Sequence, residues 1–269
     1  STPKHIVLYN AFGWTAPRFA HIPLLLNPDK SKLSKRQGDV AVEDYLKKGY
    51  LPEVLINFMA LLGWNPGTEQ EIFSLSKLIK AFDISKAQKA GAVFNLEKLD
   101  WFNREYLKRM PLDELVDRVK PWMESVKGER EKGKGESSDW LAKVIALERE
   151  RVTTLAELSE AVKFVFELPE YDGNLLVWKK SSVEDVKKIL PELANFLNKF
   201  SVQDWNKAVL EQKIGEWVKE NNYSTGSVLW PMRLALSGQK DSPGPFEIAE
   251  ALGKEETLNR LKLALDKIG

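Results

Sequence analysis

The sequence predicts a mainly α-helical protein, and three observations support that fold class. Apolar residues recur at three- and four-residue steps along most of the chain, which is the period of an amphipathic helix. The breaks between these stretches carry Gly, Pro, Asn or Ser, which end helices or form turns. One apolar run, at about residues 20–26, is predicted to be a strand.

The bulk composition is typical of a soluble globular protein. The 269 residues, 43% hydrophobic and 29% charged, suffice for one large domain or two to three small ones. The formal net charge of +1 argues against a uniformly basic coat for nucleic acid, but not against a local basic face. The absence of cysteine excludes a disulfide and a thiolate zinc site and fits a reducing compartment. No apolar run approaches the roughly 18 residues of a membrane span.

The first 39 residues combine a helix, a strand and a basic loop. Ser1 or Thr2 is a candidate cap and Pro3 suits the first helical position, so a helix is expected over 6–14. After the strand, Asn27-Pro28-Asp29 predicts a chain reversal. Because no strong strand-like run precedes this strand, we expect its sheet partners to be missing. Residues 1–39 should then be mobile, rearranged or paired with another copy.

The next part of the chain alternates helical stretches with short breaks. An amphipathic stretch covers 42–48. Apolar residues from Leu51 to Leu62 place one apolar face on a helix that should stop at Gly63. Further helices are predicted at 74–82, 95–107 and 112–127.

The second half is predicted to be helical as well. Residues 128–138 contain three glycines, two serines and mixed charge but no apolar residue, so they should form a mobile loop. The stretch from Pro169 to Gly173 is typical of a linker. Helices are predicted around 141–149, around 155–166 and through the remainder, with breaks near Ser201, 221–222, 237–238 and Gly253.

The loop Lys32-Leu33-Ser34-Lys35-Arg36-Gln37-Gly38-Asp39 is the first candidate site. Lysine ammonium groups are compact donors to phosphate oxygens, and a glycine lets the backbone approach a ligand closely. On lysine spacing alone, a solvated basic turn is the better interpretation, because short basic clusters are common.

The neighbourhood of this loop resembles the second signature of class I aminoacyl-tRNA synthetases, in its glutamyl-tRNA synthetase version. The resemblance starts at Phe19 and covers nearly all of the chain. Within the signature, Lys32, Ser34 and Lys35 match, whereas Leu33 stands where methionine is commoner and Arg36 where serine is. The other matching segments are Gly49-Tyr50-Leu51-Pro52-Glu53, Leu61-Leu62-Gly63-Trp64-Asn65-Pro66, Leu229-Trp230-Pro231-Met232-Arg233 and Ser242-Pro243-Gly244-Pro245-Phe246.

This resemblance implies an ATP-using glutamate–tRNA ligase. In the full enzyme, Lys32, Leu33, Ser34, Lys35 and Arg36 would bind ATP with Mg²⁺. The chain would be its carboxy-terminal portion, because His21-Ile22-Pro23-Leu24 lacks the glycine and second histidine of the first signature. We therefore expect it to be inactive without its missing amino-terminal catalytic half, which must hold the nucleotide and the glutamate together. No cofactor should bind tightly to this chain alone.

The resemblance also implies partners and domains. Glutamate tRNA would be the partner, with glutamine tRNA left open, and the protein would be a cytoplasmic monomer without membrane contact. The domains would be a catalytic remnant with the lysine loop (1–39), a helical stem-contact domain (40–110) and two helical anticodon-binding subdomains (111–195 and 196–269).

Residues 77–109 carry a local excess of cations with aromatic residues among them. Such cations could displace counterions from RNA phosphates, but a solvated helix face with core aromatics explains the composition equally well. The resemblance places a stem-contacting region here and favours RNA. The candidate contacts to the tRNA backbone are Lys77, Lys86, Lys89 and Arg104.

Arg233, which follows Trp230-Pro231-Met232, is the candidate for reading a base. Its planar fork can donate two hydrogen bonds to a base edge, and RNA bases are read where they are unpaired, as in an anticodon loop. An ordinary surface arginine is an equally good interpretation of the residue alone. The matching family segment contacts the anticodon. The resemblance implies the same for Ser242, Pro243, Gly244, Pro245, Arg149 and Arg151, although Pro245 replaces a larger apolar residue.

The tryptophans and histidines are expected to have structural and not catalytic roles. Most tryptophans, such as Trp64, Trp140, Trp178 and Trp205, are expected in the core. The two histidines have no metal-ligand spacing, so no metal site is expected. Two rival hypotheses remain. One is a complete ATP-using ligase, which the absent first signature disfavours. The other is a helical protein-interaction scaffold without RNA binding.

Overall fold

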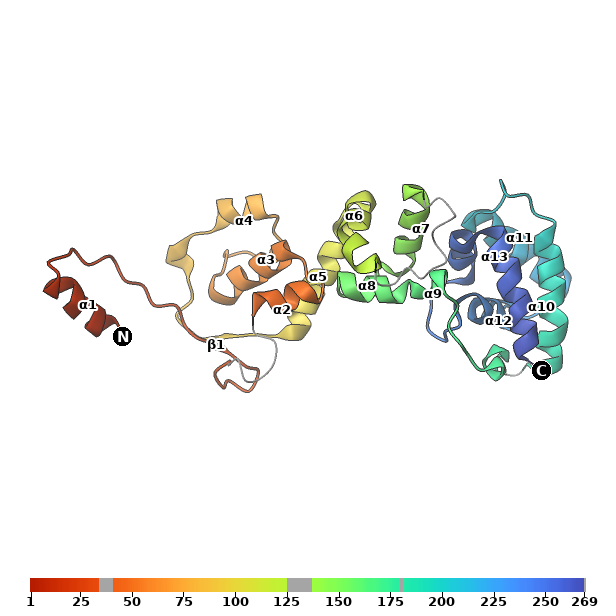
Figure 1. Cartoon of the computed structure of the whole chain (residues 1–269), viewed down its shortest axis with the longest axis horizontal. Helices are drawn as coiled ribbons and strands as arrows, with labels where there is room; N and C mark the ends of the chain where they lie inside the picture. The colour runs from red at the N-terminus through yellow and green to blue at the C-terminus, as the bar shows by residue number, and fades with distance from the viewer. Residues whose placement is uncertain (34–40, 125–136, 180, 269) are drawn as a thin grey trace. The chain divides into compact units, whose positions relative to one another are not determined.

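The computed structural model describes residues 1–33, 41–124, 137–179 and 181–268. It is mainly α-helical, as predicted, and divides into two compact units, Ser1–Asn103 and Arg104–Gly269 (Figure 1). Ser34, Lys35 and Arg36 of the lysine loop lie outside the described residues, as do residues 128–136 of the second predicted loop. The finer division into four domains stays a prediction.

The first unit begins with α1 (Thr2–Ala11), which starts and ends earlier than the predicted helix at 6–14. Ser1 occupies the cap position without a side-chain hydrogen bond, and Pro3 lies in the first turn. None of the residues of α1 is buried. The other helices of the unit are α2 (Val42–Lys47), α3 (Pro52–Gly63), α4 (Leu75–Ala81), the 3₁₀ helix η1 (Ile84–Lys86) and the first part of α5 (Leu96–Arg109).

The expected strand at 20–26 is largely wrong, and so is the expectation that its partner is missing. Residues 20–24 have no regular structure, and only β1 (Leu25–Leu26) is a strand. It pairs in parallel with β2 (Ala92–Val93), which follows it in the sequence instead of preceding it. The predicted chain reversal is confirmed, because the Asn27 N–H donates to the Ser31 carbonyl at 2.8 Å. An antiparallel bridge between Leu26 and Lys32 closes this turn.

The core of the first unit forms around α3. The predicted apolar face buries Val54, Leu55 and Phe58, while Trp64 packs against Phe73 and Leu78. Buried asparagines satisfy the backbone nearby. Asn103 Oδ1 accepts from the Leu51 N–H at 2.9 Å, and Asn57 Oδ1 accepts from the Phe73 N–H at 2.8 Å. Such bonds matter because a buried amide without a partner is costly.

In the second unit, polar caps start most helices where the sequence places Ser, Thr or Asn before an apolar stretch. Ser182 and Asp185 form a reciprocal capping box at the start of α10, which satisfies two otherwise free N–H groups. Ser137 caps α7, so Ser137 and Ser138 belong to a helix start and not to the predicted loop. The elements are α6 (Leu112–Met123), α7 (Ser138–Glu148), α8 (Leu155–Ala161), α9 (Lys163–Phe166), η3 (Gly173–Leu176), α10 (Val183–Asn198), α11 (Lys207–Glu220), α12 (Thr225–Ser237) and α13 (Pro245–Lys267).

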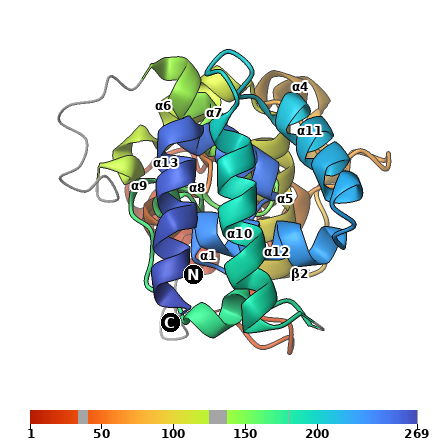
Figure 2. The same cartoon turned by 90° about the vertical axis from the view of Figure 1, so that its right-hand side faces the viewer.

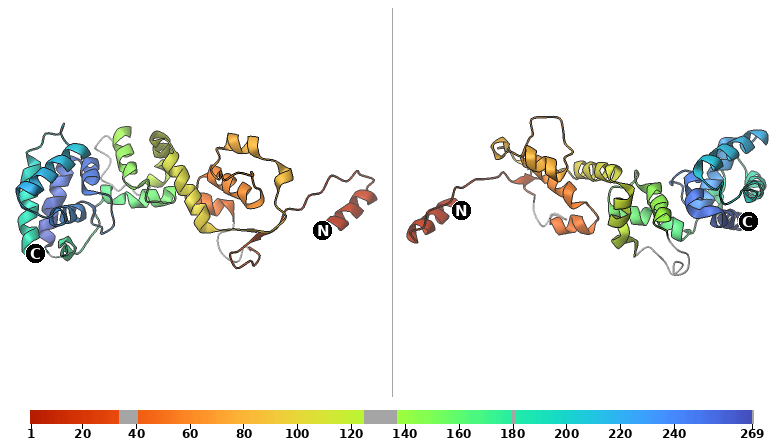
Figure 3. Two further views of the ribbon diagram at one scale, coloured as in Figure 1. Left: turned by 180° about the vertical axis from the view of Figure 1, so that it is seen from behind. Right: turned by 90° about the horizontal axis from the view of Figure 1, so that it is seen from above.

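These helices pack in two groups inside the second unit. Helices α6, α7 and α8 contact one another, while α13 contacts α10, α11 and α12 (Figure 1). The views in Figures 2 and 3 show the helices of residues 183–267, coloured cyan to blue, as one bundle. Helix α13 also contacts α7 and so joins the two groups.

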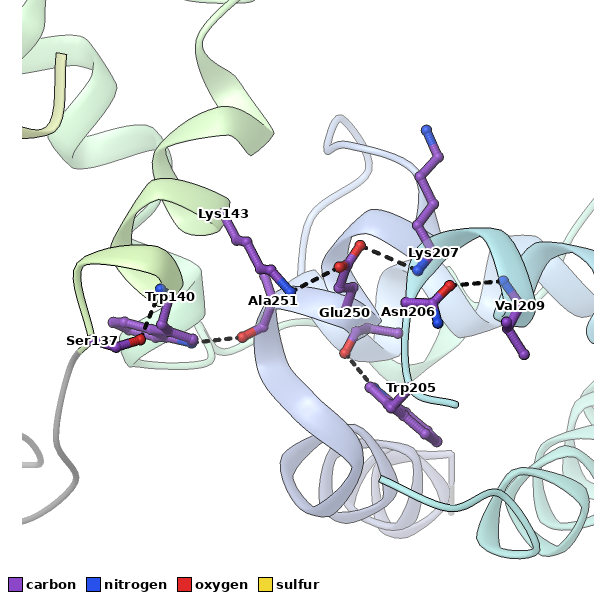
Figure 4. A network of polar contacts seen from close by, with 10 residues as sticks. Ser137, Trp140, Lys143, Trp205, Asn206, Lys207, Val209, Glu250 and Ala251 are labelled. Carbon is purple, nitrogen blue, oxygen red and sulfur yellow. Dashed lines mark hydrogen bonds and ion pairs between the residues drawn. The ribbon is translucent and has the colours of Figure 1, made fainter. Parts of the chain in front are cut away.

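The predicted break at Gly253 is confirmed inside α13. Its φ of 76° and ψ of 171° interrupt the helix, which leaves the preceding carbonyls without helical N–H partners. Trp205 Nε1 donates to the Ala249 carbonyl and Trp140 Nε1 to the Ala251 carbonyl, each at 2.8 Å (Figure 4). The predicted burial is confirmed for Trp205, as it is for Trp64. Trp140 and Trp178 are half-buried instead.

A buried arginine ties α13 to two other helices. Arg260 is 0% exposed, and its Nη1 donates to the carbonyls of Phe164 and Leu236 at 2.8 and 2.6 Å. Its Nε contacts Glu256 Oε1 at 2.8 Å. A buried charge is tolerated when it is paired and hydrogen-bonded in this way. Arg260 therefore fixes the end of α12, where the candidate site begins.

Candidate nucleic-acid interface

An open groove of about 650 Å³ lies in the second unit. Its lining comes from α7 and the residues that follow it, the start of α11, the segment between α12 and α13, and the start of α13. It brings together four residues that the sequence predicted as anticodon contacts: Arg149, Arg151, Pro243 and Gly244. The tertiary structure thus joins segments that are about 90 residues apart in the sequence.

Two lysines that the sequence did not single out also line this groove. Lys143 Nζ lies 2.9 Å from Glu250 Oε1, and Lys207 Nζ lies 2.7 Å from Glu247 Oε1. Figure 4 shows Glu250 between Lys143 and the backbone amide of Lys207. The hydrogen bond to Glu247 raises the pKa of Lys207, so this lysine stays charged. An anionic ligand would therefore compete with glutamates for these cations.

Arg149 has a structural task. Its Nε donates to the Leu107 carbonyl at 3.0 Å, and its Nη2 donates to the carbonyls of Lys108 and Met110. Carbonyls at a helix end lack intrahelical partners, and a basic side chain is a common substitute. Arg149 therefore caps the carboxy-terminal end of α5, and its contact with an anticodon stays a prediction.

Arg151 is held between two carboxylates. Its Nε lies 2.9 Å from Glu148 Oε2, and its Nη2 donates to Asp241 Oδ1. The hydrogen bond to Asp241 raises the pKa of Arg151, while burial raises the pKa of Glu148 in spite of the nearby guanidinium. Asp241 itself is exposed. Arg151 is thus a fixed cation at the edge of the groove.

Arg233 is positioned by a ring and a carbonyl. Its guanidinium lies 4.9 Å from the ring centre of Trp230, and its Nη2 donates to the Lys240 carbonyl at 2.9 Å. Trp230 is itself fixed, because its Nε1 donates to the Leu175 carbonyl at 2.8 Å. Arg233 remains half-buried. A planar fork held in one orientation is suited to a base edge, but the base-reading role stays a prediction.

The segment Ser242–Pro245 is more buried than its predicted contacts suggest. Ser242 is 3% exposed, and its Oγ lies 3.1 Å from Ser237 Oγ. Pro243 and Pro245 are buried too, and Gly244 is the cap residue of α13. Pro243 and Gly244 line the groove, whereas Ser242 and Pro245 do not. Direct contact with RNA stays a prediction for all four.

The predicted tRNA backbone contacts fall in both units. In the first unit, Lys77, Lys86 and Lys89 are exposed, and Lys86 Nζ donates to the Pro66 carbonyl at 3.2 Å. In the second unit, Arg104 is half-buried and donates to Thr153 Oγ1 at 3.0 Å. Exposed ammonium groups fit phosphate contacts, whereas Arg104 is already engaged within the protein.

The lysine loop is described only as far as Leu33. Lys32 is exposed, which fits a contact with a nucleotide phosphate. Within the described ranges, no group of three or more His, Cys, Asp or Glu is arranged to hold a metal ion. In the same part of the chain, no helix is long and apolar enough to span a membrane.

Four residues in or next to the site are not singled out by any sequence pattern: Ser237, Asp241, Lys143 and Lys207. None of them carries a local motif, because their roles arise from contacts between segments distant in the chain. A weak signal for Ser237 was present, since a helix break was predicted at 237–238.

Comparison with known proteins identifies the class. The family described as "Anticodon binding domain" matches residues 114–265, and "tRNA synthetases class I (E and Q), catalytic domain" matches residues 1–101. The first match covers more than half of the chain and includes the groove. The chain therefore belongs to the anticodon binding domain family.

Individual proteins similar to this chain carry more specific names than the two families do. A glutamate–tRNA ligase of Clostridium tetani is 43% identical over 276 residues, covering 100% of this chain and 54% of that protein. One from Clostridium novyi is 42% identical with the same coverage. The crystal structure of a glutamate tRNA ligase from Elizabethkingia meningosepticum in complex with its amino acid has a TM-score of 0.82 at 32% identity. It covers 98% of this chain and 54% of that one. The chain thus spans about half the length of the curated relatives it matches.

Proposed function

We propose that this chain is the tRNA-binding portion of a glutamate–tRNA ligase, which joins glutamate to its tRNA with the use of ATP. The observation that carries the proposal is the groove of the second unit. It lies within the matched anticodon binding domain. The segment between α12 and α13, which contributes to its lining, accepts hydrogen bonds from both Arg151 and Arg233.

In this proposal the two units have different tasks. The second unit reads unpaired bases with arginine forks, because guanidinium groups donate two hydrogen bonds in one plane. The first unit contacts phosphates through exposed lysines such as Lys86 and Lys89, which adds affinity without sequence preference. Glutamate tRNA is the partner, and whether glutamine tRNA also binds depends on small differences at the anticodon pocket.

ATP would be bound by the whole protein and not by this chain alone. Lys32, with the rest of the lysine loop, would contact its phosphates. Mg²⁺ is usually bound largely through substrate phosphates, so it would arrive with the nucleotide. Attack on the nucleotide requires ATP and glutamate to be held together, a task that we assign to an amino-terminal catalytic half. A monomer and a cytoplasmic location complete the proposal and rest on the family resemblance.

Salt-dependent binding tests the proposal. The affinity of the chain for a glutamate tRNA transcript should fall linearly with the logarithm of the salt concentration, because bound cations release counterions from phosphates. A protein-interaction scaffold predicts no tRNA binding at any salt concentration. Failure to bind glutamate tRNA even at low salt would contradict the proposed function.

A further inference from the structure

The turn between α12 and α13 contacts both arginines and one buried serine through three successive residues. The Lys240 carbonyl accepts from Arg233, the Asp241 carboxylate accepts from Arg151, and Ser242 Oγ lies 3.1 Å from Ser237 Oγ. This turn therefore fixes both guanidinium groups together with Glu148, which pairs with Arg151, and the Trp230 ring beneath Arg233.

Ser237, the last residue of α12, holds the turn through hydrogen bonds. Its side chain is 0% exposed, and its Oγ donates to the Arg233 carbonyl at 2.9 Å and accepts from the Gln239 N–H at 3.1 Å. A hydroxyl has one proton and two lone pairs. That one proton faces three acceptors, since the Ser237 hydroxyl also lies in donor geometry 3.1 Å from Ser242 Oγ and 3.2 Å from the Gln239 carbonyl. The Ser237 hydroxyl thus contacts the backbone of Arg233 and residues 239 and 242 of the turn.

The backbone around Ser237 allows little adjustment. Gly238 ends α12 with a φ of 69°, and its N–H donates to the Leu234 carbonyl at 2.7 Å. A Cβ at Gly238 would lie 2.7 Å from Pro169 Cγ. On the other side, the buried Arg260 holds the Leu236 carbonyl at 2.6 Å. The Ser237 hydroxyl therefore links a rigid helix end to the turn that accepts hydrogen bonds from both arginines.

We propose that Ser237 is a positioning residue for anticodon recognition. It does not contact RNA; it fixes residues 239–242 so that Arg233 and Arg151 meet the bases in one orientation. The inference rests on the proposed function and adds a determinant of specificity to it. Loss of the hydroxyl should lower discrimination between anticodons more than it lowers affinity for RNA in general, because the phosphate contacts lie elsewhere.

The test is the ratio of dissociation constants for two tRNAs that differ only in the anticodon, measured on the whole 269-residue chain. Ser237→Ala should reduce this ratio by roughly tenfold, within the range of couplings between contacting residues. Ser237→Thr keeps the hydroxyl and should retain most of the ratio. Ser159→Ala is the matched control, since Ser159 is a 2% exposed helical serine whose Oγ donates to the Ala156 carbonyl at 2.8 Å.

The outcomes separate this inference from the proposed function. An unchanged ratio in Ser237→Ala, or an equal loss in Ser159→Ala, would overturn the inference while leaving the proposed function intact. A wild-type chain that does not distinguish the two tRNAs would overturn both.

Two further variants keep the test decisive. If Ser237→Ala does not fold, Ser237→Cys supplies a side chain of similar size with a weak donor and should lose the ratio as well. In a background that lacks both Arg151 and Arg233, Ser237→Ala should cause no further loss. An additive loss there would show that Ser237 acts independently of the arginines, against the inference.

Discussion

At the scale of single residues, the arginines of the second unit differ in task because they differ in surroundings. Arg260 is buried and bound to carbonyls, and Arg149 caps a helix end. Arg151, which lines the groove, and Arg233, which does not, both bond to the turn between α12 and α13. The same side chain thus stabilises the fold in two places and is proposed to contact RNA in two others.

Arg149→Ala should destabilise the chain more than it alters RNA selectivity. The change removes the donor to three carbonyls at the end of α5, and unpaired polar groups of this kind cost about 1–3 kcal/mol. Urea unfolding measures the loss. Arg109→Ala is the control, because the ion pair that Arg109 forms with Glu105 at 3.0 Å lies at the surface and its loss should cost about 0.5 kcal/mol or less. Similar losses in the two variants would argue against the capping role.

Arg233→Ala should cost about 1–3 kcal/mol of binding to a tRNA with the matching anticodon, as the loss of a good two-pronged base contact does. Arg233→Lys should not restore it, because a point charge cannot copy the planar fork. The measurement is the dissociation constant for matching and changed anticodons. An equal loss for both RNAs would make Arg233 a phosphate contact or a structural residue.

At the scale of elements, most helices could be predicted and the strands could not. Helices repeat their apolar residues every three or four positions, so α3 is visible in the sequence, and α10 and α12 also begin at a capping serine. The strand β1 has two residues, and its partner Ala92–Val93 lies in a segment without a strand signal. A two-residue ladder is decided by tertiary contacts that local pattern does not encode.

The backbone strain at the break in α13 can be tested by substitution of Gly253. Gly253→Ala should cost about 1–3 kcal/mol of stability, because a φ of 76° with a ψ of 171° is a conformation open almost only to glycine. Beyond the adjacent residues of its own helix, the added Cβ would meet no described atom within 4 Å, so the cost comes from backbone strain. Gly215→Ala, in the interior of α11 and equally open, should instead stabilise by about 0.5–1 kcal/mol. Thermal unfolding of both variants measures the contrast, and a neutral Gly253→Ala would contradict the strained kink.

The candidate site was only partly visible in the sequence. Arg151 and Arg233 were named through the family resemblance, but their connection through residues 240–242 was not. It depends on Ser237, which looks like an ordinary helix end in the sequence. Lys143 and Lys207 could not be chosen over many other lysines, since only packing brings them to one groove.

For the molecule as a whole, we expect RNA binding without catalysis by this chain alone. The purified chain should not catalyse glutamate-dependent pyrophosphate exchange, because loop lysines cannot hold ATP and glutamate in line by themselves. The assay follows exchange of labelled pyrophosphate into ATP with and without glutamate. Detectable glutamate-dependent exchange would show that the described units carry a complete active site.

Anticodon recognition by this chain can be measured by exchanging anticodon loops between glutamate tRNA and an unrelated tRNA. The wild-type chain should prefer whichever RNA carries the glutamate anticodon, with each wrong base costing about 1–3 kcal/mol if it is read by a two-pronged contact. The dissociation constants of the four RNAs at one fixed salt concentration give the answer. A preference that stays with the body of the tRNA, whatever its anticodon, would show that the chain does not recognise the anticodon.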